Sequence, residues 1–214
     1  MTIAEDVAKI LLEINAVTLS PQKPYRFTSG ILSPIYCDNR LIISDVAKRK
    51  KVIECFIKSI KENQLEFDIV GGVATAGIPH AAWIAEAMKK PMVYIRSSAK
   101  EHGKNNQIEG RLENGQKVLI IEDLISTGGS IVEAVSAVRE AGGMVNNALA
   151  IMTYEMEKAK NNFAGACCTP VALSNFSTLV NVAGKLNYIP QEEIARVLEW
   201  NKNPAEWGKK MGFE

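Results

Sequence analysis

Short, unbroken apolar runs alternate with helix-length segments between residues 67 and 173, and no other feature restricts the fold as strongly. Consecutive hydrophobic positions, as in residues 118–121, are typical of strands that are buried on both faces. Strands interleaved with helices of this length indicate βαβ units, so we predict an α/β fold with a doubly wound parallel sheet flanked by helices. The predicted strands are 67–73, 91–95, 117–123, 144–154 and 166–173, and the predicted helices between them are 78–89 and 131–141.

Both ends of the chain are expected to add smaller elements to the sheet. Apolar residues recur at helical spacing from Ile3 to Ile14, which predicts an amphipathic helix. Residues 24–38 mix aromatic side chains with Ser-Gly and Ser-Pro turns, a pattern typical of short strands. We expect Ser44 to cap a helix that runs to about Asn63. The remaining expectations are helices near 176–186 and 192–200, and two tryptophans that cover apolar surface, Trp200 and Trp207.

The charge balance and the cysteines restrict the partners and the compartment. Lys and Arg total 25 against 24 Asp and Glu, and the two signs are interspersed, so neither nucleic acid nor a membrane surface is an expected partner. The four cysteines include no C-x-x-C pair, which indicates a reducing compartment. Acidic residues precede the apolar ones at the N-terminus, unlike a secretory signal, and we therefore expect a cytoplasmic protein that binds small molecules.

Residues 118–130, VLIIEDLISTGGS, end a predicted strand with two adjacent acids and then run through small residues into a helix. Open parallel sheets bind ligands at the carboxyl ends of their strands, and the amides of a helix N-terminus favour a phosphate there. The run lacks the Lys of a Walker A motif and the G-x-G-x-x-G spacing, which argues against a nucleoside triphosphate or a dinucleotide. Glu122 and Asp123 can accept hydrogen bonds from ribose hydroxyls, so a sugar phosphate is the predicted ligand. The alternative is that the two acids only end the strand and cap the helix.

The run IIEDLISTGGS resembles the phosphoribosyl pyrophosphate signature of the type I phosphoribosyltransferases. The resemblance implies the type I phosphoribosyltransferase fold and a magnesium-dependent reaction in which a base replaces pyrophosphate on ribose 5-phosphate. It also implies that Glu122 and Asp123 hold the ribose hydroxyls, with Asp123 catalytic, and that residues 126–130 wrap the 5-phosphate. Mg2+ is expected to be held mainly by the substrate and water, with no direct protein ligand. The implied binding segment is Glu122, Asp123, Leu124, Ile125, Ser126, Thr127, Gly128, Gly129 and Ser130.

Residues 96–110, RSSAKEHGKNNQIEG, form a long polar stretch without helical or strand period, and positive charge concentrates in it. A stretch of this length in a compact domain favours a lid that closes over an anion, and a solvated charged loop is the alternative. The order AKEHG resembles the catalytic loop of the orotate phosphoribosyltransferases. That resemblance implies that Arg96, Lys100 and His102 contact pyrophosphate and that Lys100 and His102 are catalytic. It also implies a homodimer in which the loop reaches the site of the neighbouring subunit.

Residues 27–40, FTSGILSPIYCDNR, resemble the N-terminal hood of the same family. The resemblance implies that Tyr36 stacks on the pyrimidine and that Ser126 lies in the orotate site. An ordinary half-buried strand aromatic is the alternative for Tyr36. Orotate is an anion, so we expect Arg40, or alternatively Arg26, to pair with its carboxylate through the planar guanidinium.

Two departures from the family pattern concern this same carboxylate. Thr28 stands where some members have a lysine, and Tyr154-Glu155 stands where some have an arginine after the strand that follows the signature. The residue that pairs with the orotate carboxylate therefore cannot be assigned from its position in the family.

Residues 71–79, GGVATAGIP, end another predicted strand and open a helix, which offers a second set of amides for an anion. By the resemblance this is the pyrophosphate loop, formed by Ala74, Thr75, Ala76 and Gly77. Tight packing between strand and helix is the alternative reason for such small residues. We expect His80, which follows, to be a hydrogen-bonded interior histidine rather than a catalyst.

Together these resemblances imply an orotate phosphoribosyltransferase, which forms orotidine 5-monophosphate and pyrophosphate in pyrimidine biosynthesis. They imply one domain over residues 1–214, with a core of about 44–174 and a hood of about 1–43 plus part of the C-terminal region. One alternative is a type I enzyme for a purine or uracil, although related purine enzymes carry an acid where this chain has Ser126. The other alternative is a regulator that binds phosphoribosyl pyrophosphate without turnover, although no basic face for DNA is evident.

Overall fold

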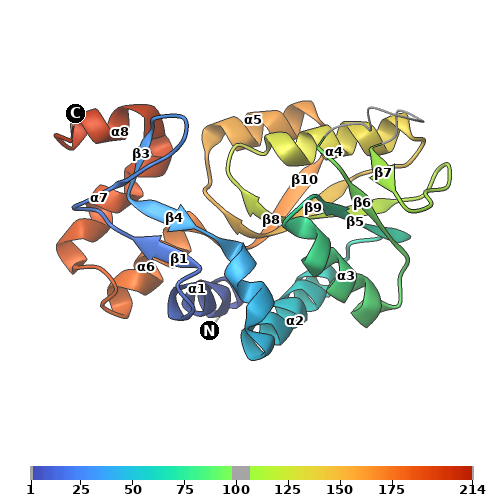
Figure 1. The fold of residues 1–214 in the computed structure, drawn as a ribbon, viewed down its shortest axis with the longest axis horizontal. Coiled ribbons are helices and arrows are strands. Elements are labelled where there is room, and N and C mark those ends of the chain that lie inside the picture. The colour runs from blue at the N-terminus through green and yellow to red at the C-terminus, as the bar shows by residue number, and fades with distance from the viewer. Residues whose placement is uncertain (1, 98–106, 214) are drawn as a thin grey trace.

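The structure, a computed structural model, describes residues 2–97 and 107–213. Within these residues the centre is a six-stranded sheet in the order β10-β9-β8-β5-β6-β7 (Figure 1). All neighbours from β10 to β6 pair in parallel, which confirms the predicted α/β fold with its doubly wound sheet. The parallel strands are β5 (Ile69–Val73), β6 (Met92–Ile95), β8 (Val118–Ile125), β9 (Asn147–Thr153) and β10 (Thr169–Asn175).

The edge strand β7 (Ile108–Glu109) departs from the sequence prediction. The pattern predicts no strand within residues 96–110, but Ile108 and Glu109 pair antiparallel with Ile95 and Tyr94 of β6. The prediction is therefore wrong for these two residues. A two-residue strand is too short to show alternation, and it forms because β6 offers an open edge beside it.

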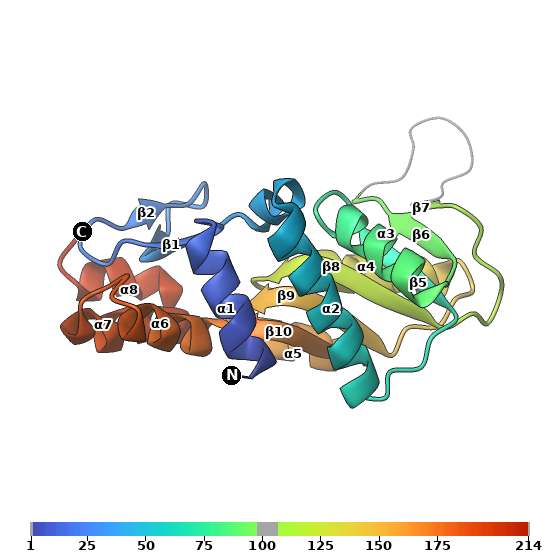
Figure 2. The ribbon, with the colours of Figure 1, turned by 90° about the horizontal axis from the view of Figure 1, so that it is seen from below.

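Helices cover both faces of the sheet (Figures 1 and 2). α2 (Val46–Glu62) and α3 (Gly77–Met88) lie on one face, and α4 (Gly129–Glu140) and α5 (Glu157–Gly165) lie on the other. Each pair packs over its own buried cluster: Ile84 belongs to the first cluster, and Phe163 belongs to the second. This two-sided covering explains why the strands carry apolar residues at consecutive positions.

α5 is missing from the helices predicted from the sequence. Its residues, EKAKNNFAG, are mostly polar, and Ala159 and Phe163 are its buried positions. Two apolar positions four residues apart are too few to distinguish a short helix from a polar loop. The helix is stabilised by burying Phe163 against the sheet, a tertiary contact that local pattern does not reveal.

α2 begins later than predicted, because Asp45 caps it in place of Ser44. The Asp45 carboxylate accepts a hydrogen bond from the Lys48 amide at 2.9 Å. Ser44 instead ends the 3-10 helix η1 (Asn39–Ser44), where its hydroxyl donates to the Leu41 carbonyl at 3.1 Å. The prediction for Ser44 is wrong because two adjacent residues have capping side chains and η1 occupies the first of them.

A smaller unit, which we call the hood, lies at the left end of Figure 1 and consists of β1 to β4 and α6 to α8. β1 pairs with β4 and β2 pairs with β3, both antiparallel. Trp200 and Trp207 are buried as predicted, and their indole N–H groups donate to the carbonyls of Leu32 and Arg196. The hood elements are β1 (Val17–Leu19), β2 (Tyr25–Arg26), β3 (Leu32–Ser33), β4 (Ile35–Cys37), α6 (Phe176–Lys185), η2 (Gln191–Glu193), α7 (Ile194–Leu198), η3 (Trp200–Lys202) and α8 (Pro204–Lys210).

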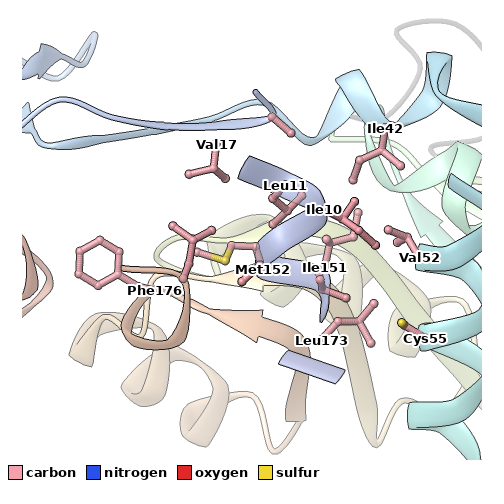
Figure 3. Packing of buried hydrophobic residues seen from close by; sticks show 14 of the residues in the cluster. Ile10, Leu11, Val17, Ile42, Val52, Cys55, Ile151, Met152, Leu173 and Phe176 are labelled. Atoms are coloured by element: carbon pink, nitrogen blue, oxygen red, sulfur yellow. The ribbon is translucent and has the colours of Figure 1, made fainter. Parts of the chain in front are cut away.

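The N-terminal helix α1 (Ile3–Glu13) connects the hood to the sheet. Thr2 and Glu5 form a capping box at its start, and the helix packs against α6 and β10. Figure 3 shows Leu11 of α1 beside Met152 of β9, with Val17 of the hood above them. One buried cluster therefore continues from the sheet through α1 into the hood and holds the two units together. Within the described part of the chain, none of the helices has the length and the apolar content that a bilayer crossing requires.

Candidate functional site

The candidate site lies where β5 and β8 end side by side. After β5 the chain places β6 on one side of it and then crosses over to place β8 on its other side. The direction in which strands are added therefore reverses between β5 and β8. Ligands of open α/β sheets bind at such a reversal, outside the carboxyl ends of the strands. The predicted pyrophosphate loop follows β5, and the predicted signature loop follows β8, so the structure brings the two together.

Gly77 brings the start of α3 against β8. A Cβ atom at this position would collide with the backbone oxygen of Ile121, the residue that precedes the acid pair. The peptide bond between Ala74 and Thr75 is cis, and the Ala74 amide donates to the Ile95 carbonyl at 2.8 Å. No side chain of the described residues caps α3, and the Ile78 amide donates to the Thr75 carbonyl at a long 3.4 Å, so the start of the helix can receive an anion beside the acids.

The signature loop leads into α4 without a side-chain cap within the described chain. Gly128 has a φ of 77°, a left-handed conformation that favours glycine, and a Cβ atom there would lie 2.8 Å from the Phe163 ring. Asn162 donates its side-chain amide to the Thr127 carbonyl at 2.9 Å. The unpredicted helix α5 therefore supports the loop through Asn162 and Phe163, two residues for which the sequence carries no functional signal.

The two acids differ in accessibility. Glu122 is 6% exposed; its Oε1 accepts from the Asp123 amide at 3.0 Å and its Oε2 accepts from the Ser130 hydroxyl at 3.1 Å. Asp123 is only partly buried. Burial and then the charge of Asp123 raise the pKa of Glu122, and burial also raises the pKa of Asp123. The pair therefore favours ligands that supply hydrogen-bond donors or positive charge, with Asp123 as the more accessible contact.

Tyr36, on the hood strand β4, and Arg40, on η1, lie near this acid pair. Tyr36 is 45% exposed, and its ring centroid lies 5.7 Å from that of Tyr25. The Arg40 guanidinium forms a fork on Asp38, with Nε at 2.6 Å from Oδ1 and a terminal nitrogen at 3.0 Å from Oδ2. Arg40 also interacts electrostatically with Tyr36 and Asp123, and its charge opposes the rise in the pKa of Asp123. Three predicted site residues thus come together from two parts of the sequence.

Arg26, the alternative cation, lies in the β2-β3 hairpin, where it donates to the Gly30 carbonyl at 3.0 Å. Glu155, which stands where some family members have an arginine, accepts from the amide and the hydroxyl of Ser177 at 2.8 and 2.6 Å. Its carboxylate therefore binds the first turn of α6. This contact accounts for the acid at position 155. Of Arg26 and Arg40, it is Arg40 that interacts with the acid pair.

Ser126 and Arg96 lie at two further edges of the site. The Ser126 hydroxyl is 3.9 Å from the Met156 sulfur. Arg96 follows β6 and lies 3.6 Å from the Glu109 carboxylate, while the Gln107 side chain donates to the Arg96 carbonyl at 3.1 Å. The predicted flap is thus anchored at both ends by β6 and β7. Lys100 and His102 lie outside the described residues.

His80 is interior, as expected, but the described residues supply none of the hydrogen bonds that we expected for it. Neither ring nitrogen has a partner among the described residues, and the ring packs against Phe56 and Trp83. Burial lowers the pKa of His80 to about 4. The prediction of a hydrogen-bonded histidine is wrong because the surrounding side chains are aromatic rather than polar.

No group of three or more His, Cys, Asp or Glu side chains suited to a metal ion occurs in residues 2–97 and 107–213. The acid pair would hold a divalent ion through the substrate and water rather than as direct ligands, which matches the reluctance of Mg2+ to lose its own water shell. Burial raises the pKa of both carboxyl groups and so favours their protonated forms. A neighbouring cation would have the opposite effect and would favour the ionised forms of Glu122 and Asp123.

Comparison with known proteins agrees with this geometry. Residues 41–165 match the family described as phosphoribosyl transferase domain. The chain is similar to the orotate phosphoribosyltransferase of Coxiella burnetii, with 55% identity over 97% of this chain and 99% of the relative. An orotate phosphoribosyltransferase of Enterococcus faecalis is 51% identical over the same shares of both chains. The crystal structure of orotate phosphoribosyltransferase from Aeropyrum pernix has a TM-score of 0.74 and 27% identity, covering 86% of this chain and 99% of that one.

Proposed function

Because the chain belongs to the orotate phosphoribosyltransferase family, we propose that it transfers the ribose 5-phosphate group of 5-phosphoribosyl 1-diphosphate to orotate. The products are orotidine 5-monophosphate and pyrophosphate, a step of pyrimidine biosynthesis. The observation that carries this proposal is the acid pair at the end of β8, flanked by two helix N-termini that no described side chain caps. Two anionic groups on either side of a sugar match that arrangement.

Each of the two helix N-termini binds one anionic group of the diphosphate substrate. The 5-phosphate binds residues 126–130 at the start of α4, where Gly128 allows the backbone to turn toward the anion. The pyrophosphate binds residues 74–77 at the start of α3. Asp123 and Glu122 lie between them and accept hydrogen bonds from the ribose hydroxyls.

Transfer breaks the bond between the anomeric carbon and the pyrophosphate oxygen, which keeps the bonding electrons. The ionised ring nitrogen of orotate then supplies the electron pair of the new carbon–nitrogen bond. Positive charge develops on the ribose between these events, and the nearby Asp123 carboxylate stabilises it. When bound with the substrate, Mg2+ would neutralise charge on the departing pyrophosphate.

Tyr36 and Arg40 form the orotate side of the site. The exposed face of Tyr36 stacks on the pyrimidine ring, and Ser126 lines the same space. The Arg40 fork binds the orotate carboxylate, for which its present partner, the Asp38 carboxylate, is a chemical equivalent. Arg40 is therefore the proposed determinant for an acidic pyrimidine over uracil or a purine.

We further propose a cytoplasmic homodimer in which the flap of each subunit covers the site of its neighbour. Lys100 and His102 then approach the pyrophosphate from the partner, while Arg96 approaches from the anchored base of the flap. A cationic flap stabilises the leaving group and excludes water from the reactive sugar. These roles rest on the resemblance of residues 96–110 to the family loop.

The test follows the ultraviolet absorbance of orotate after 5-phosphoribosyl 1-diphosphate is added, with and without Mg2+. We expect turnover of orotate that requires the metal ion and stops with a chelator. Hypoxanthine, adenine and uracil are run alongside as competing bases. Faster turnover of any of them would contradict the proposed substrate, whereas binding of the diphosphate without turnover of any base would favour a regulator.

A further inference from the structure

The structure assigns Asn39 a role as a positioning residue, which fixes the catalytic Asp123 relative to η1 and to the hood strand β4 that precedes it. The inference rests on the proposed function for its catalytic consequence, but its geometric basis is independent of any ligand. Asn39 begins η1 and is 1% exposed. Its side-chain amide donates to the Asp123 carbonyl at 2.9 Å, across 84 positions of sequence.

The bond meets β8 where the strand has lost one neighbour. β8 pairs with β5 only as far as Ile121, which lies opposite Gly72. Its pairing with β9 continues to Ile125. Among the described strands, residues 122–125 therefore have a neighbour on one side only, and on this stretch Asn39 supplies a hydrogen bond that a strand no longer provides.

Asn39 itself is held in one orientation. The Cys37 thiol lies 3.4 Å from its Oδ1 and donates to it, so both ends of the buried amide have partners. A rotation of the amide by half a turn would place its oxygen against the Asp123 carbonyl and lose both bonds. The contact therefore specifies one position of η1 against β8.

The same short segment carries the residues proposed to bind orotate. Tyr36 lies three positions before Asn39, and Arg40 follows it directly. The Arg40 amide and guanidinium are both fixed by Asp38, which precedes Asn39. Asn39 thus connects the segment over the base to the backbone of Asp123, whose carboxylate is proposed to contact the ribose. The spacing of these two groups determines whether the ring nitrogen reaches the anomeric carbon.

Loss of this bond should affect chemistry more than binding of the diphosphate substrate. The 5-phosphate loop has its own support, the hydrogen bond from Asn162 to the Thr127 carbonyl. Misplacement of a reacting group by about 1 Å can lower a rate by roughly a hundredfold. We expect Asn39→Ala to lower kcat by about 10- to 100-fold and to change the KM for the diphosphate less than about threefold.

The experiment compares Asn39→Ala and Asn39→Asp with Asn201→Ala. Asn201 is a matched control because its side-chain amide likewise donates to a remote backbone carbonyl, that of Tyr154 at 3.2 Å, which lies outside the signature. Kinetics are measured with both substrates, together with thermal unfolding and backbone amide hydrogen exchange of residues 122–125 in the ligand-free proteins. Asn39→Asp preserves the shape, and its carboxyl group can donate only when protonated, so activity relative to Asn39→Ala should recover as the pH falls.

The inference requires that hydrogen exchange at 122–125 accelerates in Asn39→Ala and not in Asn201→Ala, alongside the selective loss of kcat. Equal kinetics and equal exchange in the two alanine variants would overturn it while leaving the proposed function intact. A wild-type protein that turns over no orotate would instead contradict the proposed function, and unchanged exchange at 122–125 would then reject the positioning role as well.

Discussion

Gly77 lies against Ile121 so closely that a single added carbon would collide with the Ile121 backbone oxygen. This contact joins the start of α3 to β8 at the residue before the acid pair. A backbone oxygen cannot rotate away as the end of a side chain can, so the contact admits only glycine. The pyrophosphate loop and the signature are thereby kept at a fixed separation.

Gly77→Ala is therefore expected to destabilise the protein by about 1–3 kcal/mol, as overpacking does, and to raise the KM for the diphosphate substrate. Gly165→Ala is the matched control, because it lies in α5 with no atom close to an added Cβ. Chemical denaturation and steady-state kinetics on both variants check the prediction. Equal stability and equal KM in the two variants would show that the loop position does not depend on this contact.

Arg40→Ala should raise the KM for orotate by roughly tenfold or more, because a charged bidentate contact with the carboxylate is lost. The KM for the diphosphate should change little. Arg26→Ala serves as the comparison, since Arg26 is the alternative cation for the orotate carboxylate. An unchanged orotate KM in Arg40→Ala, with an increase in Arg26→Ala, would transfer the role to Arg26.

The raised pKa of the acid pair predicts that the acidic limb in the pH profile of kcat/KM lies at a higher pH than ordinary carboxyl groups would give. Burial and the neighbouring Asp123 raise the pKa of Glu122, so the pair takes up a proton at a higher pH than isolated carboxyl groups do. Activity should therefore fall above the ordinary carboxyl range as the pH is lowered. Glu122→Gln removes the carboxyl group whose pKa is raised and should move this limb to lower pH. Glu157→Gln, which changes an exposed carboxylate on α5, should leave the limb in place; a shift of equal size there would contradict the assignment.

His80 predicts a loss of stability in mild acid. Burial lowers its pKa from 6.5 to about 4, so the folded protein disfavours the proton that the unfolded chain accepts. The free energy of unfolding should be unaffected by this group above pH 6.5 and should fall as the pH drops toward 4, by about 3 kcal/mol in total. Denaturant titrations at pH 7 and pH 5 on His80→Leu should show a weaker pH dependence than the wild type. His102→Ala, which removes the only other histidine, is the control and should retain the wild-type dependence.

The shared flap predicts complementation between two inactive variants. Asp123→Asn lacks the acid of its own site, and His102→Ala lacks the flap residue that it would contribute to its partner. Mixed dimers then contain one site with both native residues, so random mixing should restore about a quarter of the wild-type activity. Recovery is measured after joint unfolding and refolding, with each variant refolded alone as the control. Absence of recovery, with mixed dimers present, would mean that each flap serves its own subunit.

The local sequence pattern was sufficient to predict those features of the protein that consecutive residues determine. The alternation of apolar runs and helices predicts the parallel sheet, because strands covered on both faces must be apolar throughout. Glu122 and Asp123 next to Ser126–Ser130 likewise predict the site, because a strand end, two acids and a helix start are adjacent in the chain. The position of these segments at the reversal of strand order agrees with that prediction.

Contacts between distant segments could be known only from the folded structure. Asn39 reaches Asp123 across 84 positions, and Asn162 reaches Thr127 across 35, and neither asparagine differs locally from an ordinary surface residue. Glu155 binds α6 in place of a ligand, and β7 forms because β6 lies beside it. A hydrogen bond between a side chain and a remote carbonyl produces no periodic pattern in the sequence. The contacts that hold the site in place therefore depend on how the helices and strands pack.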